Sequence, residues 1–266
     1  SRDHRLRLHI NTGMKTDHSY GLIPFDVIKR DRRDVFQGVQ NGTQPNSGFV
    51  TVTEDKNSLS IINEGVYEYE HLNHDKGTIA MTILRSCALL SRIRLPEIHS
   101  DMLQPGNQCL REITVRLAIY PHEGDYIDSD VISELNQLYN PLLTFNQHFD
   151  SKKFCGGRPA VQDTDIAEIF FREDPFKEIA IPEKIQLLNI EGRGVAVSAL
   201  KKAQDGGLYI VRICNLSEAD TVAKINIHFP YQQTYELALN ETVIGNIDVN
   251  EIPMKPKQIK TIGIIK

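Results

Sequence analysis

Short segments in which apolar and polar residues alternate recur along this chain, and this period-two pattern is typical of half-buried β-strands. Residues 4–12 read HRLRLHINT, with leucine and isoleucine alternating against arginine and histidine. We therefore expect a half-buried first strand with a basic outer face. Further strands are expected at Gly21–Lys29 (with a bend or sheet edge at Pro24), Gly48–Thr53, Leu59–Asn63 and Val66–Glu70. Gly48–Thr53 and Leu59–Asn63 should form a hairpin.

The stretch from Gly77 to His122 contains the two strongest apolar runs. Thr78–Leu90 is apolar on both faces, which predicts a central strand that is covered on both sides. Ile113–Tyr120 alternates, and we expect both runs to belong to one sheet. The loop of roughly twenty residues between them is unusually long for a compact β domain, and such loops often have a function.

A helix and a second group of strands complete the pattern. Ser129–Phe145 has apolar residues three and four apart, which predicts a helix near 129–141 with Asp128 or Ser129 as N-cap and Pro141 as its end. After Asp165 the strands are short and regularly spaced. We therefore expect a mainly β protein with one short helix, a large antiparallel β-sandwich at residues 1–165 and a smaller β-sandwich at 166–266.

The composition of the chain argues against several classes of function. The net charge is −5, 40% of residues are hydrophobic and 24% are charged, so the chain lacks the basic footprint of a nucleic-acid-binding protein. No apolar run is long enough to cross a bilayer, and no apolar segment of a signal peptide follows Ser1. The four cysteines show no metal-binding spacing, which favours small buried residues in a reduced, cytoplasmic protein.

Several motifs carry a family resemblance. They are ILRS at 83–86, LSR at 90–92, PGNQCL at 105–110 and YPH at 120–122, with FDV at 25–27, SIINEGVYEYE at 60–70 and the closing MKPKQIKTIGI. In this combination the chain resembles the C-terminal β domain of family-38 glycoside hydrolases, the α-mannosidases, and most of all the bacterial branch that includes mannosylglycerate hydrolases. The resemblance implies a galactose-mutarotase-like supersandwich for the large domain. Leu216 stands where the family usually has proline.

The resemblance also implies what lies outside this chain. Retaining glycosidases need two carboxylates about 5 Å apart, and family-38 enzymes hold a zinc ion through histidine and aspartate side chains. These groups lie in an N-terminal catalytic barrel. We therefore expect no catalytic residue and no metal ligand in this chain. Its partners are expected to be the barrel of the same polypeptide and an α-mannoside bound by the full enzyme, which can be a homo-oligomer. The abrupt start at Ser1 suggests a segment of a longer chain.

An independent carbohydrate-binding or adhesive β module is the alternative function. The absence of tryptophan and the aromatic fraction of 7% count against it, because such modules commonly stack aromatic rings on sugars.

The long loop supplies the candidate binding residues. Gln108 and its neighbour Asn107 carry amides that can donate to and accept from sugar hydroxyls, and Gly106 permits a left-handed turn or a close backbone approach. The alternative is that Gln108 only braces the loop through bonds to other parts of the chain.

Two other polar groups have structural explanations that we favour. His71 and His74 form an H-x-x-H pair, but with no distant third ligand they are more often solvated than bound to zinc. His122, Glu123 and Asp125 follow a strand, where a structural turn with a capping carboxylate is the favoured interpretation over catalysis.

Overall fold

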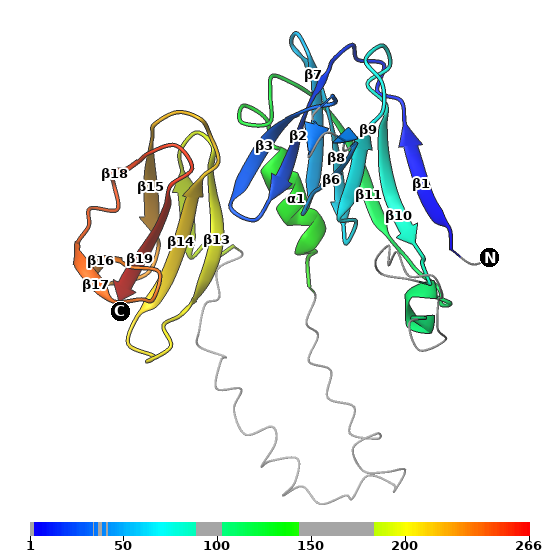
Figure 1. The fold of residues 1–266 in the computed structure, drawn as a ribbon. Helices are drawn as coiled ribbons and strands as arrows, with labels where there is room; N and C mark the ends of the chain where they lie inside the picture. The colour runs from blue at the N-terminus through cyan, green and yellow to red at the C-terminus, as the bar shows by residue number, and fades with distance from the viewer. Residues whose placement is uncertain (1–2, 34, 37–38, 41, 89–102, 144–183) are drawn as a thin grey trace, which may run out of the picture. The chain divides into compact units, whose positions relative to one another are not determined.

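The computed structural model describes residues 3–33, 35–36, 39–40, 42–88, 103–143 and 184–266. Every strand pairing in these ranges is antiparallel, and one α-helix, α1 (Val131–Tyr139), accompanies the strands (Figure 1). The prediction of a mainly β protein with one short helix is therefore confirmed. No helix in the described ranges has the length and apolar character needed to cross a membrane.

Two sheets form the large sandwich. The first has the strand order β1-β10-β9-β6 and the second has the order β11-β8-β7-β2-β3. Their bounds are β1 (Arg5–Ile10), β2 (His18–Ile23), β3 (Asp26–Asp31), β6 (Thr43–Pro45), β7 (Phe49–Glu54), β8 (Asn57–Glu64), β9 (Glu68–His71), β10 (Ile79–Arg85) and β11 (Arg116–Glu123). A two-stranded ribbon of β4 (Val35–Phe36) and β5 (Val39–Gln40) lies between β3 and β6 in the chain.

The second sheet is apolar on both faces. The first face packs against the four-stranded sheet through buried side chains that include Val50, Val52, Ile61 and Met81. On the opposite face α1 covers the sheet, where Val131 and Leu135 join a buried cluster with Phe49 and Ile62. The helix ends before Pro141, as the sequence predicts, with Asn140 as its C-cap. The predicted N-cap was wrong: the helix starts at Val131 with Asp130 as N-cap, and Asp128 is instead ion-paired with Arg193. The predicted hairpin is also present, because β7 and β8 pair from Phe49↔Ile62 to Glu54↔Asn57.

Two predictions about strands need correction. The two apolar runs of the 77–122 stretch do not share a sheet: β10 lies inside the four-stranded sheet, whereas β11 is an edge of the five-stranded one. The expected strand Gly21–Lys29 is two strands, β2 and β3, joined at Pro24 and Phe25. Phe25 has φ +65°, so the proline lies in a hairpin turn rather than in a strand.

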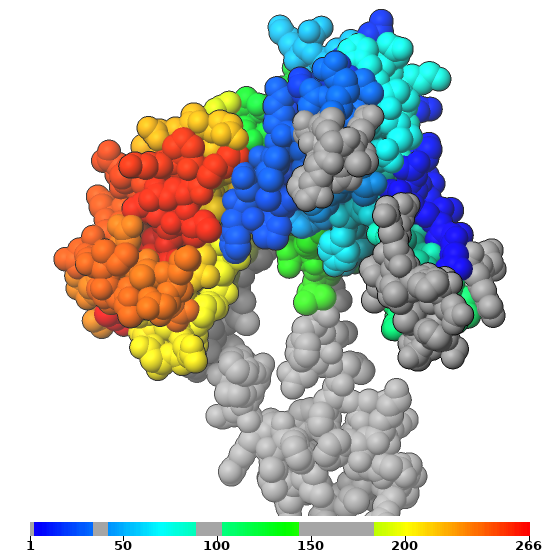
Figure 2. Space-filling model, viewed as in Figure 1, coloured from blue at the N-terminus to red at the C-terminus, as the bar shows by residue number. Residues whose placement is uncertain are grey.

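Strand β1 is less buried than its alternation predicts. Among the described strands it pairs with β10 alone, and Leu6 and Leu8 are 54% and 43% exposed. The chain's first strand, dark blue in Figure 2, accordingly lies at the surface. Its arginines do form the polar face that we expect, because Arg5 and Arg7 are ion-paired with Glu68 and Glu70 of β9.

Two further sheets form a smaller sandwich. Their strand orders are β12-β15-β18 and β13-β14-β19-β16-β17. The bounds are β12 (Leu188–Glu191), β13 (Val195–Lys202), β14 (Tyr209–Asn215), β15 (Thr221–Ile227), β16 (Gln233–Leu237), β17 (Val243–Asn246), β18 (Ile252–Met254) and β19 (Ile259–Ile265). Val211, Ile213, Ile225 and Ile262 lie in the core between them. The expected boundary between the two sandwiches, after residue 165, lies outside the described residues.

Candidate functional site

The loop that the sequence singles out is held against the end of β10. The described part of the loop contains one 3-10 turn, η2 (Pro105–Gln108). On one side of the turn the Gln104 N–H donates to the Ala88 carbonyl at 2.8 Å, and on the other the Cys87 N–H donates to the Asn107 carbonyl at 3.3 Å. These bonds hold η2 against the two residues Cys87 and Ala88, which follow β10.

Gln108 is buried, and both ends of its amide are bonded to one residue. Its Oε1 accepts a hydrogen bond from the Asp3 N–H at 3.1 Å, and its Nε2 donates to Asp3 Oδ1 at 3.0 Å. The same Oδ1 accepts the N–H of Ala88. The amide therefore braces the loop, the end of β10 and the residues before β1 into one unit, and this arrangement supports the bracing role of Gln108.

Asn107 differs from Gln108 in having an unused donor. Its backbone carbonyl accepts from Cys87, but the side-chain Nδ2 is buried without a hydrogen-bond partner. A buried donor without a partner is costly, so a polar group that reached this atom would bind favourably. The predicted binding role of Asn107 and Gln108 stays a prediction: the Gln108 amide is already bonded to Asp3, and the unpartnered Asn107 Nδ2 is enclosed by the protein.

Gly106 does not have the conformation that we expect. The residue of this turn with a left-handed backbone is Cys109, with φ +51°, whereas Gly106 is absent from the positive-φ residues of the described chain. No heavy atom lies within 4 Å of the place where a Cβ on Gly106 would be. Neither a left-handed turn nor a close backbone approach therefore explains this glycine.

An open cavity of about 380 Å³ adjoins the loop. Polar groups of Asp3, Gln104 and Gln108 line it together with the apolar side chains of Leu103 and Leu110. Gln108 and Asp3 are bonded to each other, so few of the polar groups that line the cavity are available to bind a ligand.

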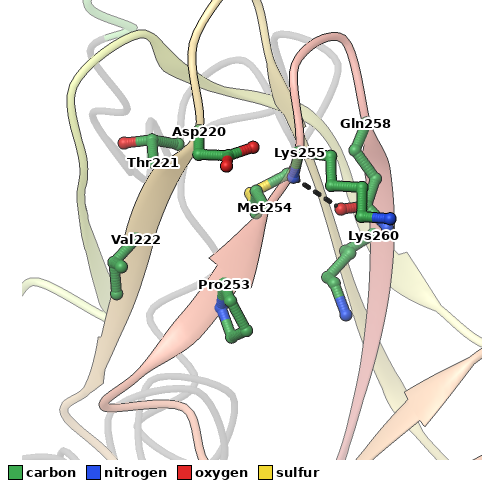
Figure 3. A pocket seen from close by; sticks show the side chains of 8 residues that line it. All are labelled: Asp220, Thr221, Val222, Pro253, Met254, Lys255, Gln258 and Lys260. Atoms are coloured by element: carbon green, nitrogen blue, oxygen red, sulfur yellow. Dashed lines mark hydrogen bonds between the residues drawn. The ribbon is translucent and has the colours of Figure 1, made fainter.

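A second groove, of about 600 Å³, lies in the smaller sandwich among β15, β18 and β19 (Figure 3). Met254 lies between Asp220 and Lys255 in this view, and the Lys255 N–H donates to the Gln258 amide oxygen. Lys260 also lines the groove, but its ammonium is 2.7 Å from Glu236 and is thereby neutralised. The groove is thus lined by both polar and apolar residues, and some of its polar groups already have partners within the protein.

The YPHEGD turn has a structural role. Asp125 Oδ1 accepts the N–H groups of Ile127 at 2.8 Å and Asp128 at 3.3 Å, which caps the turn that leads into α1. His122 Nε2 is 2.9 Å from the hydroxyl oxygen of Ser60, a residue fully buried in β8. A nucleophile with no access to solvent cannot receive a substrate, so this serine–histidine pair joins β8 to β11 and does not form a catalytic centre.

The donor set for a metal is also missing from the described chain. No group of three or more His, Cys, Asp or Glu side chains in these ranges could hold an ion. His71 and His74 do not converge on a shared partner: His74 Nδ1 lies 3.5 Å from Asp17, and both ring nitrogens of His71 are unpartnered. The described residues therefore do not fit a zinc centre.

Comparison with known proteins connects the smaller sandwich to a family. Residues 194–262 match the sequence model of the "Glycosyl hydrolases family 38 C-terminal beta sandwich domain". The resemblance to family 38 is confirmed. Curated proteins give no match to the sequence.

Solved structures extend the likeness to the whole fold. An α-mannosidase from Enterococcus faecalis V583 matches all of this chain with 22% identity and a TM-score of 0.69. A family 38 glycosyl hydrolase structure from Enterococcus faecalis matches all of it with 21% identity and a TM-score of 0.67. The chain spans 26% and 27% of those two chains, about a quarter of their length. At these identities the likeness is one of fold.

Sequence reasoning identified the loop but missed Asp3, which makes two hydrogen bonds to Gln108. No local signal identifies Asp3, because its partner Gln108 is 105 positions away. Only a knowledge of which strands pair would bring the two together.

Proposed function

We propose that this chain is the non-catalytic C-terminal β portion of an α-mannosidase-like glycoside hydrolase. The observation that carries the proposal is the match of the entire chain to about a quarter of an α-mannosidase structure. The family match at 194–262 supports it independently. In this proposal the sandwiches support a catalytic barrel of the same polypeptide, which works in the cytoplasm and hydrolyses α-mannosides.

The catalytic groups are assigned to the barrel. Retaining hydrolysis needs a nucleophilic carboxylate and an acid/base carboxylate about 5 Å apart. Asp3, the carboxylate that lines the cavity beside the loop, is already bonded to Gln108 and Ala88. The zinc ion that the resemblance implies is assigned there as well, because the described residues offer no set of ligands for it. This chain contributes support to the barrel.

Activity measurements test this proposal. The purified chain should not hydrolyse an aryl α-mannoside, with or without added zinc. A longer natural polypeptide that contains these 266 residues should hydrolyse it, and a chelator should abolish that activity. Zinc-dependent turnover by the isolated chain would refute the non-catalytic role.

A binding measurement separates this function from an independent module. Calorimetric titration of the isolated chain with methyl α-mannoside and mannobiose should give no heat of binding, because most of the pocket is assigned to the barrel. Saturable binding to the isolated chain would instead support a free-standing carbohydrate-binding module.

A further inference from the structure

The large sandwich exposes apolar side chains on the side where β1 and β11 are the edges of its two sheets. Leu8 of β1 is in register with Met81, and Ile119 of β11 is in register with Ile61. Both partners are fully buried in the core between the sheets, so the two edge residues face the interior. Leu8 and Ile119 are nevertheless 43% and 58% exposed, because no described strand continues either sheet on this side.

The opposite side of the sandwich is closed. There β3 and β6 are the edges, and the Arg30 side chain of β3 donates from Nη1 to the Pro45 carbonyl of β6. The guanidinium also lies over the Tyr69 ring, and Arg30 is only 7% exposed. The edges β3 and β6 are thus joined across the sandwich, whereas no hydrogen bond or ion pair among the described residues joins β1 to β11.

The arginines of β1 do not protect its free edge. Edge strands are often guarded by charged side chains that discourage a further strand from pairing. Arg5 and Arg7, however, extend over the sheet to Glu68 and Glu70 of β9, which lies on the far side of β10. Both arginines are therefore neutralised on the face that is turned away from the core. The backbone edge of β1 remains accessible to another strand.

The polypeptide that would precede Ser1 is the segment best placed to cover this side. The proposed function includes such a polypeptide, because the chain spans 26% of the matching α-mannosidase structure and the matching family model is that of a C-terminal domain. Asp3 is bonded to Gln108 and Ala88, so a preceding segment would begin beside the start of β1. Consecutive strands are neighbours in about two-thirds of cases, and an antiparallel neighbour needs only a short turn.

We propose that a strand of the longer polypeptide, located before Ser1, pairs antiparallel with β1 and covers the exposed apolar residues of β1 and β11. Its backbone bonds to the N–H and C=O groups of β1 that do not point towards β10. Its inward-facing side chains are apolar, because they contact Leu6, Leu8 and Ile119. The inference rests on the proposed function, since both require the longer polypeptide. In the complete enzyme β1 is then an inner strand of its sheet.

Hydrogen exchange followed by mass spectrometry tests the pairing without any substitution. The isolated chain is compared at one pH with a longer natural polypeptide that contains these 266 residues. The β1 amides that do not bond to β10 should exchange rapidly in the isolated chain and at least about tenfold more slowly in the longer polypeptide. Peptides from β8, which lies inside its sheet in both proteins, should be equally protected and control for folding.

Labelling of introduced cysteines tests the apolar cover. Leu6→Cys and Ile119→Cys place a thiol on each edge, at positions that are 54% and 58% exposed in the isolated chain. The matched control is Ile244→Cys, at a 66% exposed position of β17 in the smaller sandwich. Relative to this control, iodoacetamide should modify both edge thiols at least about tenfold more slowly in the longer polypeptide, because the added strand covers them. Peptide mapping separates these thiols from the natural cysteines.

Equal exchange of the β1 amides in the two proteins would overturn the proposal. Protection of β1 that appears in the isolated chain as its concentration rises would also overturn it, because a second copy would then be the occupant. If the isolated chain does not stay folded, the longer polypeptide decides alone: β1 amides that exchange much faster than those of β8 contradict the pairing. The proposed function can fail separately, because a longer polypeptide that hydrolyses an aryl α-mannoside while β1 is exposed supports that function and contradicts this inference.

Discussion

Gln108 and Asp3 are joined by two hydrogen bonds across 105 positions of sequence. The two bonds use the carbonyl and the amino end of one amide, so they fix both the position and the orientation of the Gln108 side chain. A loop that follows β10 is thereby held to the residues that precede β1. This pair is the strongest evidence for how the loop is supported.

Replacing Gln108 by alanine should therefore destabilise the isolated chain. The change leaves the Asp3 N–H and carboxylate without this partner, so we expect the free energy of unfolding to fall by about 1–3 kcal/mol. Urea denaturation of the wild type and the variant measures the difference. Gln104→Ala is the matched control, because Gln104 lies in the same cavity wall with an exposed side chain.

The opposite result would revive a substrate role for Gln108. In that case Gln108→Ala leaves the melting temperature of the isolated chain unchanged. In the complete enzyme, kcat/KM then falls by about two- to tenfold, the effect of losing one neutral hydrogen bond. The two measurements together separate bracing from binding.

Gly106→Ala should be neutral, or should stabilise the chain by up to about 1 kcal/mol. The reason is that an added Cβ meets nothing within 4 Å and restricts the unfolded chain. Gly194→Ala is the contrasting variant, since Gly194 has φ +71° and its added Cβ would lie 3.1 Å from Ser217. In thermal unfolding, the melting temperature of Gly194→Ala should be well below that of Gly106→Ala. A large fall in the melting temperature of Gly106→Ala would show that the turn needs glycine.

Two isoleucines that face each other across β8 and β11 should respond very differently to truncation. Ile61 and Ile119 are register partners, but Ile61 is fully buried and Ile119 is 58% exposed on the edge strand. Ile61→Ala should cost about 2–5 kcal/mol of unfolding free energy, and Ile119→Ala less than about 0.5 kcal/mol. Equal losses in denaturant titrations would mean that the edge of β11 is covered in solution.

Lys257 should stabilise the contact between its own turn and β3. Its Nζ donates to the carbonyls of Val27 at 3.1 Å and Leu216 at 2.9 Å, and it lies 2.5 Å from Asp26. Lys257→Met should cost about 1–3 kcal/mol, because hydrogen bonds from a charged donor are lost. Lys255→Met, two residues earlier with an exposed side chain, is the control. Identical unfolding curves for the two variants would contradict the prediction.

Local structure could be predicted well from the sequence because its signals are local. The helix was predictable because apolar residues three and four apart recur before Pro141, and the β7–β8 hairpin because two alternating runs flank a polar turn. In the smaller sandwich, β17 and β18 were missed, because strands of four and three residues are too short to show a period.

Pairing between distant segments could not be predicted in the same way. Alternation shows that β10 and β11 are strands, but it does not say which strands they pair with, and the loop between them is long enough to let them enter different sheets. The Asp3–Gln108 bonds depend on that same topology. At the turn itself, the choice of Cys109 over Gly106 for the left-handed residue goes against the usual preference for glycine.

The pairing of β1 with β10 has a consequence for how the protein is made. Arg5 is opposite Arg85, so β1 can pair with β10 only after some 80 further residues have been translated, which takes about 4–16 s at common rates of synthesis. During that interval Leu6 and Leu8 are on a nascent segment that lacks this partner strand. A ribosome that pauses between residues 11 and 78 prolongs the exposure to chaperones and to other nascent chains. The choice of codons in that interval should therefore influence how much folded protein a cell obtains.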